Sequence, residues 1–340
     1  MSDSQMRREI AEIPEAVARL LDRADAPVRA AAAAMRAADP AVLLTVARGS
    51  SDHACTYLKY VSELLLGLPV ASVGPSVASV YGARLRVRGA VALAVSQSGQ
   101  SPDIVEMTRS LGAGGALTVA LTNDAGSRLA GVAGQVIDIC AGPERSVAAT
   151  KTFVTSALAG LWLLAEVKGD RDLLAAIHGL PAVLETARGL DWSPVAAALG
   201  GGSIFTLGRG PAWAIANEAA LKFKEVLQVH AESYSSAEVL HGPVSIVDCG
   251  FPVLAFAAAD AAETALAEVA DALAAKGAEV FATTDRVAAA RALPVVRTGH
   301  PLADPLALVV AFYAMIEQLA VARGLDPDMP RHLRKVTETT

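Results

Sequence analysis

Short apolar runs of strand type alternate with amphipathic helical segments, and this alternation constrains the fold more than any other feature of the sequence. The first run, at 41–47, is followed by a helical pattern, and further runs come at 90–95, 117–122 and 136–140. Strands that alternate with helices form parallel sheets with helices on both faces. We therefore predict an α/β fold built from doubly wound parallel sheets.

The second half of the chain repeats the order of the first. Residues 203–211 match residues 42–50 at an offset of 161 positions, with Arg209 against Arg48. Further strand-like runs and a closing helix follow in the same order, at 253–257, 279–284, 295–298 and 306–322. Such a repeat predicts two tandem domains of one fold.

These patterns divide the 340 residues into five predicted parts. They are an N-terminal helical brace (1–40), a first α/β domain (41–168), a helical connector (169–202), a second α/β domain (203–325) and a C-terminal tail (326–340). We expect two short helices in the brace, because Pro14 and Pro27 interrupt its helical pattern.

Composition excludes several classes of protein. A net charge of −6 offers no basic surface to nucleic acid. Cys55, Cys140 and Cys249 are odd in number and lack metal-ligand spacing, so we expect neither disulfides nor a metal or other cofactor. The chain does not start with an apolar leader, and apolar runs such as 306–316 are short for a bilayer. A soluble, cytoplasmic protein without a membrane partner is predicted.

A serine-rich turn, Ser-Gln-Ser-Gly-Gln-Ser at 96–101, separates an apolar run from the next helical segment. The first turn of a helix has unpaired N–H groups and a partial positive charge, which suit a phosphate. A second hydroxyl-rich turn follows the run at 41–47, and ligands of parallel sheets bind at such strand ends. The alternative is a serine cluster that only caps the helix. The second copy has 257–260, Ala-Ala-Ala-Asp, in this place, so we expect it to lack a phosphate turn.

The helical segment after Pro211 carries Glu218, Lys222 and Glu225 on one face. A carboxylate near a lysine can move a proton if burial and neighbours tune its pKa. The alternative is a solvent-exposed ion-pair surface. His241, in the stiff turn His-Gly-Pro that follows, favours the catalytic interpretation.

The tail contains Lys335, which could act as an amine nucleophile if burial or a cationic neighbour lowers its pKa. Arg331 and Arg334 are near in sequence. The default expectation for a proline-containing tail is disorder.

Seven motifs in order along the chain resemble the sugar isomerase (SIS) superfamily, and most closely the isomerase half of the glutamine–fructose-6-phosphate aminotransferases. They are Arg-Gly-Ser-Ser at 48–51, the turn at 96–101, Ala-Thr-Lys-Thr at 149–152, Leu-Lys-Phe-Lys-Glu at 221–225, His-Ala-Glu at 230–232, Glu-Val-Leu-His-Gly-Pro at 238–243 and Pro-Arg-His-Leu-Arg-Lys at 330–335.

The resemblance implies a role for each of these residues. Glu225 would move a proton between C1 and C2 of a sugar phosphate, with Lys222 beside the reacting end. His241, from the neighbouring subunit of a homodimer, would assist ring opening. The tail at 326–340 would be ordered and fold over the substrate to exclude water, and its Lys335 would form an imine. The implied sugar-phosphate ligands are Ser50, Ser51, Ser96, Gln97, Ser98, Ser101, Thr150 and Lys151.

The sequence also departs from the synthases. They carry a glutaminase domain with an N-terminal cysteine, whereas the first cysteine here is Cys55, so ammonia from glutamine is not expected. His332 and Gln100 stand where the synthases usually have Asn and an acid. The tail is similar to that of free-standing SIS-type deaminases, so we predict deamination of glucosamine 6-phosphate to fructose 6-phosphate and ammonia.

Several alternatives stay open at this point. The same proton transfer would serve a phosphosugar isomerase, a deglycase for fructosamine phosphates, or a synthase-type reaction that forms the amino sugar. A sugar-phosphate sensor is the non-enzymatic alternative. Such regulators carry a helix-turn-helix, for which residues 1–40 are too short.

Overall fold

The computed structural model describes residues 3–200 and 202–335, which form two compact units. Unit A comprises Glu15–Glu144, Lys151–His178 and, from the tail, Arg334 and Lys335. Unit B comprises residues 3–14, Arg145–Thr150 and the described part of Gly179–Leu333. Each unit contains one five-stranded parallel sheet, which confirms the predicted α/β class.

The sheet of unit A has the strand order β2-β1-β3-β4-β5. Its strands are β1 (Leu43–Val46), β2 (Val70–Ser72), β3 (Val91–Ser96), β4 (Leu117–Thr122) and β5 (Gln135–Asp138). Every residue of β1 and β3 is buried, because helices cover both faces of the sheet. The chain crosses from one side of β1 to the other between β2 and β3, so the sheet reverses its winding direction between β1 and β3.

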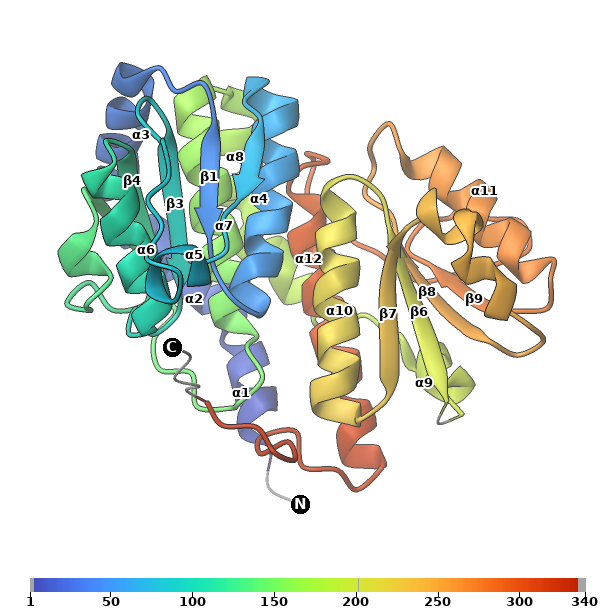
Figure 1. The fold of residues 1–340 in the computed structure, drawn as a ribbon. Coiled ribbons are helices and arrows are strands. Elements are labelled where there is room, and N and C mark those ends of the chain that lie inside the picture. The colour runs from blue at the N-terminus through green and yellow to red at the C-terminus, as the bar shows by residue number, and fades with distance from the viewer. Residues whose placement is uncertain (1–2, 201, 336–340) are drawn as a thin grey trace. The chain divides into compact units, whose positions relative to one another are not determined.

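The helices of unit A are α2 (Ile13–Arg23), α3 (Asp25–Ala38), α4 (Ser50–Leu66), α5 (Ser76–Ser79), α6 (Pro102–Ala113), the 3₁₀ turn η1 (Ala130–Val132) and α7 (Lys151–Lys168); the first two residues of α2 belong to unit B. Helix α7 packs against α3 and α4, and α6 packs on β3 and β4 (Figure 1). Ile104 and Leu111 of α6 join Val46 and Ala94 of the strands in one apolar core.

The sheet of unit B has the order β10-β9-β8-β6-β7. Its strands are β6 (Ser203–Gly208), β7 (His230–Ser235), β8 (Pro252–Phe256), β9 (Glu279–Ala282) and β10 (Arg291–Ala292). The helices are α1 (Gln5–Ala11), α8 (Arg171–Ala187), which begins in unit A, α9 (Ser193–Ala198), α10 (Pro211–Leu227), η2 (Glu238–His241), η3 (Pro243–Ile246), α11 (Glu263–Ala274) and α12 (Asp304–Ala322). Figure 1 shows α10 between β7 and α12, and it packs against both.

The two sheets repeat each other down to single turns. Helix α10 begins and ends 161 positions after α4, and α11 begins and ends 161 positions after α6. Gly49 and Gly210, which precede α4 and α10, share a positive φ of 54° and 57°. The predicted duplication is therefore confirmed, with the same offset as in the sequence.

Helix α12 is the central helix of unit B. It has 19 residues with a mean hydropathy of 1.8, so it is longer than the run at 306–316 and meets the length and composition of a membrane span. However, 83% of this helix is buried inside the protein, as in a core helix.

Four local predictions were wrong or incomplete. The brace contains three helices, because α1 ends at Ala11 and a new helix starts at Ile13, before Pro14. The strand predicted at 295–298 lies instead at Arg291–Ala292. The segment 230–235 was not predicted as a strand, because its polar residues suit an edge strand, β7, that is only partly covered. His241 ends a 3₁₀ turn rather than a simple turn.

Candidate active site

Both serine-rich turns of unit A lie at the carboxyl ends of β1 and β3, where the sheet reverses its winding direction. Ser50 and Ser51 open α4 directly after β1, and Ser96 is the last residue of β3. Because β1 and β3 are hydrogen-bonded neighbours, the two turns lie side by side. This edge of a parallel sheet is the usual ligand site of the fold.

The hydroxyl groups of the second turn have different local partners. Ser96 Oγ accepts a hydrogen bond from Gly99 N at 3.2 Å, and Ser98 Oγ accepts one from Gln100 N at 3.2 Å. Ser101 is the N-cap residue of α6, yet its side chain makes no capping hydrogen bond. Gln97, Ser98 and Ser101 are half-buried. Helix capping by the Ser101 side chain therefore does not account for this cluster. In the first turn of α6, Pro102 has no N–H group and Ile104 N donates to Asp103 Oδ1 at 2.9 Å, so hydroxyl groups are the main donors that this edge offers an anion.

Gly99 shapes this turn because no other residue fits there. Its φ is +61°, and a Cβ at this position would lie 2.2 Å from Ser127 Oγ and 2.8 Å from Thr122 Oγ1. Its carbonyl accepts a hydrogen bond from Leu129 N at 2.9 Å. The turn is thus held tightly against the next loop, with its amides close to any bound group.

A salt bridge that sequence reasoning missed joins the two turns. Arg48 donates from Nε and Nη2 to Asp103 Oδ2, at 3.2 and 3.0 Å. The Asp103 side chain is only 2% exposed, whereas that of Arg48 is 51% exposed. Arg48 therefore braces the start of α6 and keeps part of its guanidinium open to solvent at the same edge. Two features of the sequence could have indicated this salt bridge. Arg48 follows closely after one strand, and Asp103 lies in the first turn of the helix after the neighbouring strand.

The equivalent edge of unit B is filled by its own ion pairs. Arg297 donates to Ala257 O at 2.9 Å and to Glu263 Oε1 at 2.9 Å, and it lies 3.5 Å from Asp304 Oδ2. Glu263 is the first residue of α11, where unit A has Pro102 at the start of α6. A carboxylate of the protein thus lies at the start of α11, where Arg297 is bonded to it.

The charged residues of α10 form a buried network in unit B. Lys222 Nζ lies 3.1 Å from Glu218 Oε1 and 2.6 Å from Glu225 Oε2. The side chains of Glu218 and Lys222 are 0% exposed, and that of Glu225 is 21% exposed. Tyr313 of α12 donates to Glu218 Oε1 at 2.9 Å. The solvent-exposed ion-pair alternative is therefore wrong, and Glu225 is the end of the network that solvent reaches.

Lys222 stays protonated in this network. Burial by itself would lower the pKa of Lys222, but the carboxylates of Glu218 and Glu225 outweigh it, and its pKa is raised above the ordinary lysine value. Lys222 is therefore a fixed cation beside Glu225 and not a free amine nucleophile.

His241, another predicted residue of unit B, is exposed at the end of η2. Leu240 and Ile246 beside it are also exposed, at 46% and 57%. On the neighbouring strand β7, Tyr234 donates to Glu232 Oε2 at 2.6 Å, and this bond raises the pKa of Tyr234 to about 12.

Lys335 has a partner that the sequence did not indicate. Its Nζ donates to Glu144 Oε2 at 2.9 Å, and the Glu144 side chain is 0% exposed. The same carboxylate accepts hydrogen bonds from Thr152 N at 3.1 Å and Thr152 Oγ1 at 2.5 Å. Glu144 therefore ties the tail to the start of α7. Residues 336–340 of the predicted tail lie outside the described residues.

Thr150 and Lys151, both predicted substrate ligands, lie at the start of α7 and are buried, at 0% and 1% exposure. The serine turns, by contrast, present half-buried side chains. Across the described residues, no three His, Cys, Asp or Glu side chains gather as metal ligands do.

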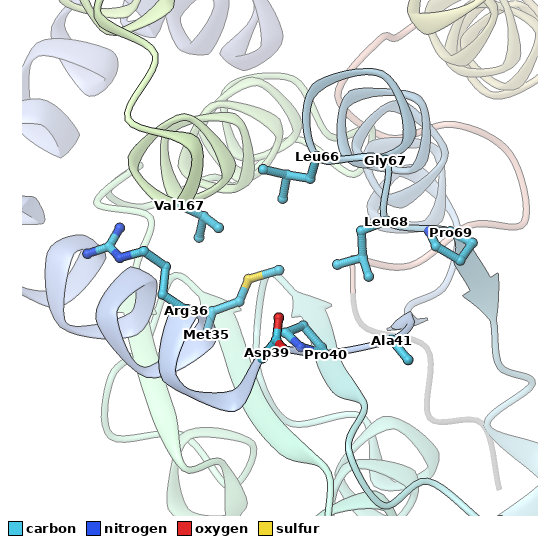
Figure 2. Close-up of a pocket in the computed structure, with 10 residues that line it drawn as sticks. All are labelled: Met35, Arg36, Asp39, Pro40, Ala41, Leu66, Gly67, Leu68, Pro69 and Val167. Carbon is cyan, nitrogen blue, oxygen red and sulfur yellow. The ribbon is translucent and has the colours of Figure 1, made fainter.

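Unit A also has a pocket at the opposite edge of its sheet. It is a cavity of about 380 Å³ at the amino ends of β1 and β2, and the C-terminal turns of α3, α4 and α7 line it (Figure 2). Met35, Leu66, Leu68 and Val167 provide apolar walls, and Arg36 and Asp39 provide charge. None of the predicted site residues lines it, so it is separate from the candidate site.

Known proteins resemble this chain over nearly its whole length. It is 34% identical to a glutamine–fructose-6-phosphate aminotransferase of Aeropyrum pernix over 97% of this chain and 56% of that protein. The chain thus spans about half the length of the curated relatives it matches.

Two solved structures are similar as well. A Silicibacter pomeroyi protein assigned as a phosphosugar isomerase is 65% identical, with a TM-score of 0.93 over 96% of this chain and 100% of that one. The C-terminal domain of glucosamine-fructose-6-phosphate aminotransferase from Francisella tularensis is 25% identical, with a TM-score of 0.83 over 97% and 99% of the two chains. The SIS domain family model matches residues 38–166 and 201–322, which are the two sheets described above, and the chain belongs to this family.

Proposed function

We propose that this chain is an enzyme that interconverts aldose and ketose forms of a phosphosugar. The observation that carries the proposal is Glu225, a partly exposed carboxylate at the end of an otherwise buried Glu218–Lys222 network. A base that moves a proton between two carbons must reach its substrate and be held in place, and a fixed ammonium beside it meets the second need. The similarity to the Silicibacter pomeroyi protein supports the same reaction class.

Two groups of residues have proposed roles in this chemistry. In unit A, the turns around Ser51 and Ser98 would bind the phosphate through hydroxyl and amide donors. In unit B, Glu225 would take the proton from C2 and return it to C1. We further propose that His241 assists ring opening from the neighbouring subunit of a homodimer.

The proposed substrate is glucosamine 6-phosphate, and the products are fructose 6-phosphate and ammonia. Proton transfer from C2 to C1 converts the open-chain aldehyde-amine into a ketimine. Water then adds to C2 and ammonia leaves, so one water is consumed for each ammonia released. Alternatively, the Lys335 amine displaces ammonia by imine exchange, and water releases the lysine afterwards.

A second candidate is the reverse, synthetic reaction. The 34% identical relative is named as a glutamine–fructose-6-phosphate aminotransferase, and this name favours the synthetic direction. A simple isomerase and a deglycase for fructosamine phosphates use the same proton transfer. A sugar-phosphate sensor would need no buried Lys222 beside a partly exposed Glu225, so we rank it last.

One assay tests the proposal. Purified protein is incubated with glucosamine 6-phosphate, and ammonia and fructose 6-phosphate are followed together. Equal amounts of both products are expected; the absence of both would overturn the deaminase. N-acetylated, galacto-configured and fructosamine phosphates then rank the alternatives, and glutamine added with fructose 6-phosphate tests the prediction that it yields no glucosamine 6-phosphate.

The proposed homodimer has its own test. Two variants, Glu225→Gln and His241→Gln, are mixed after separate purification and allowed to exchange subunits. If His241 acts across the interface, mixed dimers contain one intact site and part of the activity returns. If activity does not return although mixed dimers form, His241 does not act from the partner.

Fractionation of the source cells tests the proposed cytoplasmic location.

A further inference from the structure

Helix α1 is bonded to two segments that lead directly to proposed functional residues. One is residues 145–147, three positions before Thr150. The other is residues 326–328, seven positions before Lys335. Both sets of bonds lie within unit B.

Glu9 of α1 holds the first segment. Its side chain is 0% exposed, and its carboxylate accepts hydrogen bonds from the backbone N–H groups of Arg145 and Ser146, the latter at 3.2 Å to Oε2. Gln5 Nε2 also donates to Glu9 Oε1, at 3.0 Å. A buried carboxylate is costly unless such donors surround it, so the loss of any of these bonds is expected to weaken the contact between α1 and residues 145–146.

Asp328 holds the second segment to the same helix. Its two carboxylate oxygens accept hydrogen bonds from the backbone amides of Gln5 and Met6, both at 2.7 Å. Amides in the first turn of a helix have no acceptor within the helix, and they attract a negative charge such as that of Asp328. The carbonyl of Asp328 accepts a hydrogen bond from Val147 N at 3.2 Å, so the two segments are also bonded to each other.

Helix α1 is itself anchored in the core of unit B. Ser4 Oγ donates to Glu317 Oε1 at 2.6 Å, and Arg7 Nε donates to Glu317 Oε2 at 3.0 Å. Glu317 lies on α12 and its side chain is 2% exposed. Helix α1 is therefore bonded through Ser4 and Arg7 to a buried residue of α12, and it connects the two segments to the core of unit B.

We propose that Glu9 and Asp328 are positioning residues, which hold the segment before Thr150 and the segment before Lys335 in their working conformations. This inference rests on the proposed function of those segments. Neither carboxylate needs to touch the substrate. A backbone shift of about 1 Å in either segment is expected to lower turnover by roughly 10- to 100-fold.

The test uses isosteric variants in the full-length protein. Glu9→Gln and Asp328→Asn each replace one carboxylate oxygen by an NH₂ group, which faces a backbone donor and cannot accept its hydrogen bond. Glu9→Asp restores the charge. Glu15→Gln and Asp25→Asn are matched controls on exposed side chains, at 79% and 47% exposure.

Three quantities are measured at a temperature where every variant is folded. Hydrogen exchange reports on residues 145–150 and 326–335 without any substrate. Borohydride reduction with fructose 6-phosphate, followed by peptide mass spectrometry, measures the adduct on Lys335. Steady-state kinetics separate kcat from KM.

If Glu9 and Asp328 are positioning residues, hydrogen exchange in the two segments should be faster in Glu9→Gln and Asp328→Asn. Both variants should also form less Lys335 adduct and have a lower kcat. Glu9→Asp should recover part of each loss. A lower melting temperature with control-like exchange and kcat would mean a merely structural role and would overturn the inference. If the parent protein neither turns over a phosphosugar nor forms an adduct, the proposed function fails. Control-like exchange in both variants overturns the inference in that case too.

Discussion

Lys222 Nζ lies 2.6 Å from Glu225 Oε2, and the two side chains differ in exposure, at 0% and 21%. The carboxylate that solvent reaches is thus fixed by a cation that solvent does not reach. This relationship fits the two proposed roles on one helix face, in which Lys222 would orient Glu225 and Glu225 would exchange a proton with the substrate.

Replacing Glu225 by Gln keeps the shape of the side chain but removes the base. Turnover should fall by about 10² to 10⁴, because that is the usual contribution of a positioned acid–base group, while phosphosugar affinity should change little. Isotope exchange at C2 and a binding titration measure the two effects. Glu268→Gln on the exposed face of α11 is the control. Parental exchange in Glu225→Gln would assign the proton transfer to another residue.

Replacing Lys335 by Arg keeps a positive charge beside Glu144 but cannot form an imine. Borohydride trapping with fructose 6-phosphate should label the parent protein at Lys335 and leave Lys335→Arg unlabelled. Mass spectrometry of the C-terminal peptide reads the result. Parental turnover in the variant would limit Lys335 to an electrostatic role.

Replacing Lys222 by Met leaves Glu218 and Glu225 without their shared cation. We expect unfolding free energy to fall by about 3–5 kcal/mol, the usual result of breaking a buried ion pair from one side. Denaturant titration measures the loss. Lys224→Met, on the exposed side of α10, is the matched control.

The double variant Glu218→Gln/Lys222→Met should be more stable than Lys222→Met alone, because it removes one of the two uncompensated charges. No recovery would show that packing, not charge, sets the loss.

Because the folded pKa of Lys222 is raised, its contribution to stability is fully present below about pH 10.4, the unfolded lysine value, and is lost only as pH rises through the higher folded value.

Gly99→Ala should destabilise unit A. The positive φ alone costs about 1–2 kcal/mol for a residue with a Cβ, and the contact with Ser127 Oγ adds to it. Gly131→Ala is the control, since a Cβ there meets nothing within 4 Å and the φ is not positive. Equal melting temperatures for the two variants would mean that the turn at 96–101 relaxes freely.

The three cysteines should react with iodoacetamide at different rates. Burial, assisted by the charge of Asp138, raises the pKa of Cys140 to about 11, and burial also raises the pKa of Cys55. Only a fraction of about 10⁻³ of Cys140 is thiolate at pH 8, and its rate should rise about tenfold per pH unit up to about pH 11. Exposed Cys249 should be labelled first. Mass spectrometry gives the order, and labelling of Cys140 as fast as Cys249 would contradict it.

The periodicity of apolar residues predicted most strands and helices, because helices and buried strands impose different spacings on core residues. The strand at 291–292 and the edge strand at 230–235 were missed, since both are short or polar and depend on their neighbours in the sheet. The sequence placed Glu218, Lys222 and Glu225 on one helix face, and the structure joins them in one ion-pair network, but the sequence did not show that this face is buried. Periodicity places residues on one face of a helix without showing what covers that face.

The amino-acid sequence by itself therefore determined the duplication, the parallel sheets and the turns at their carboxyl ends, because these follow from local spacing. Only the tertiary structure decided that Tyr313 and α12 cover Glu218 and Lys222, that Glu144 receives Lys335, and that Arg297 fills the second copy's turn. Each of these contacts joins residues 34 or more positions apart. The pairing of distant charges depends on which surfaces the packed elements bury, and local spacing does not contain that information.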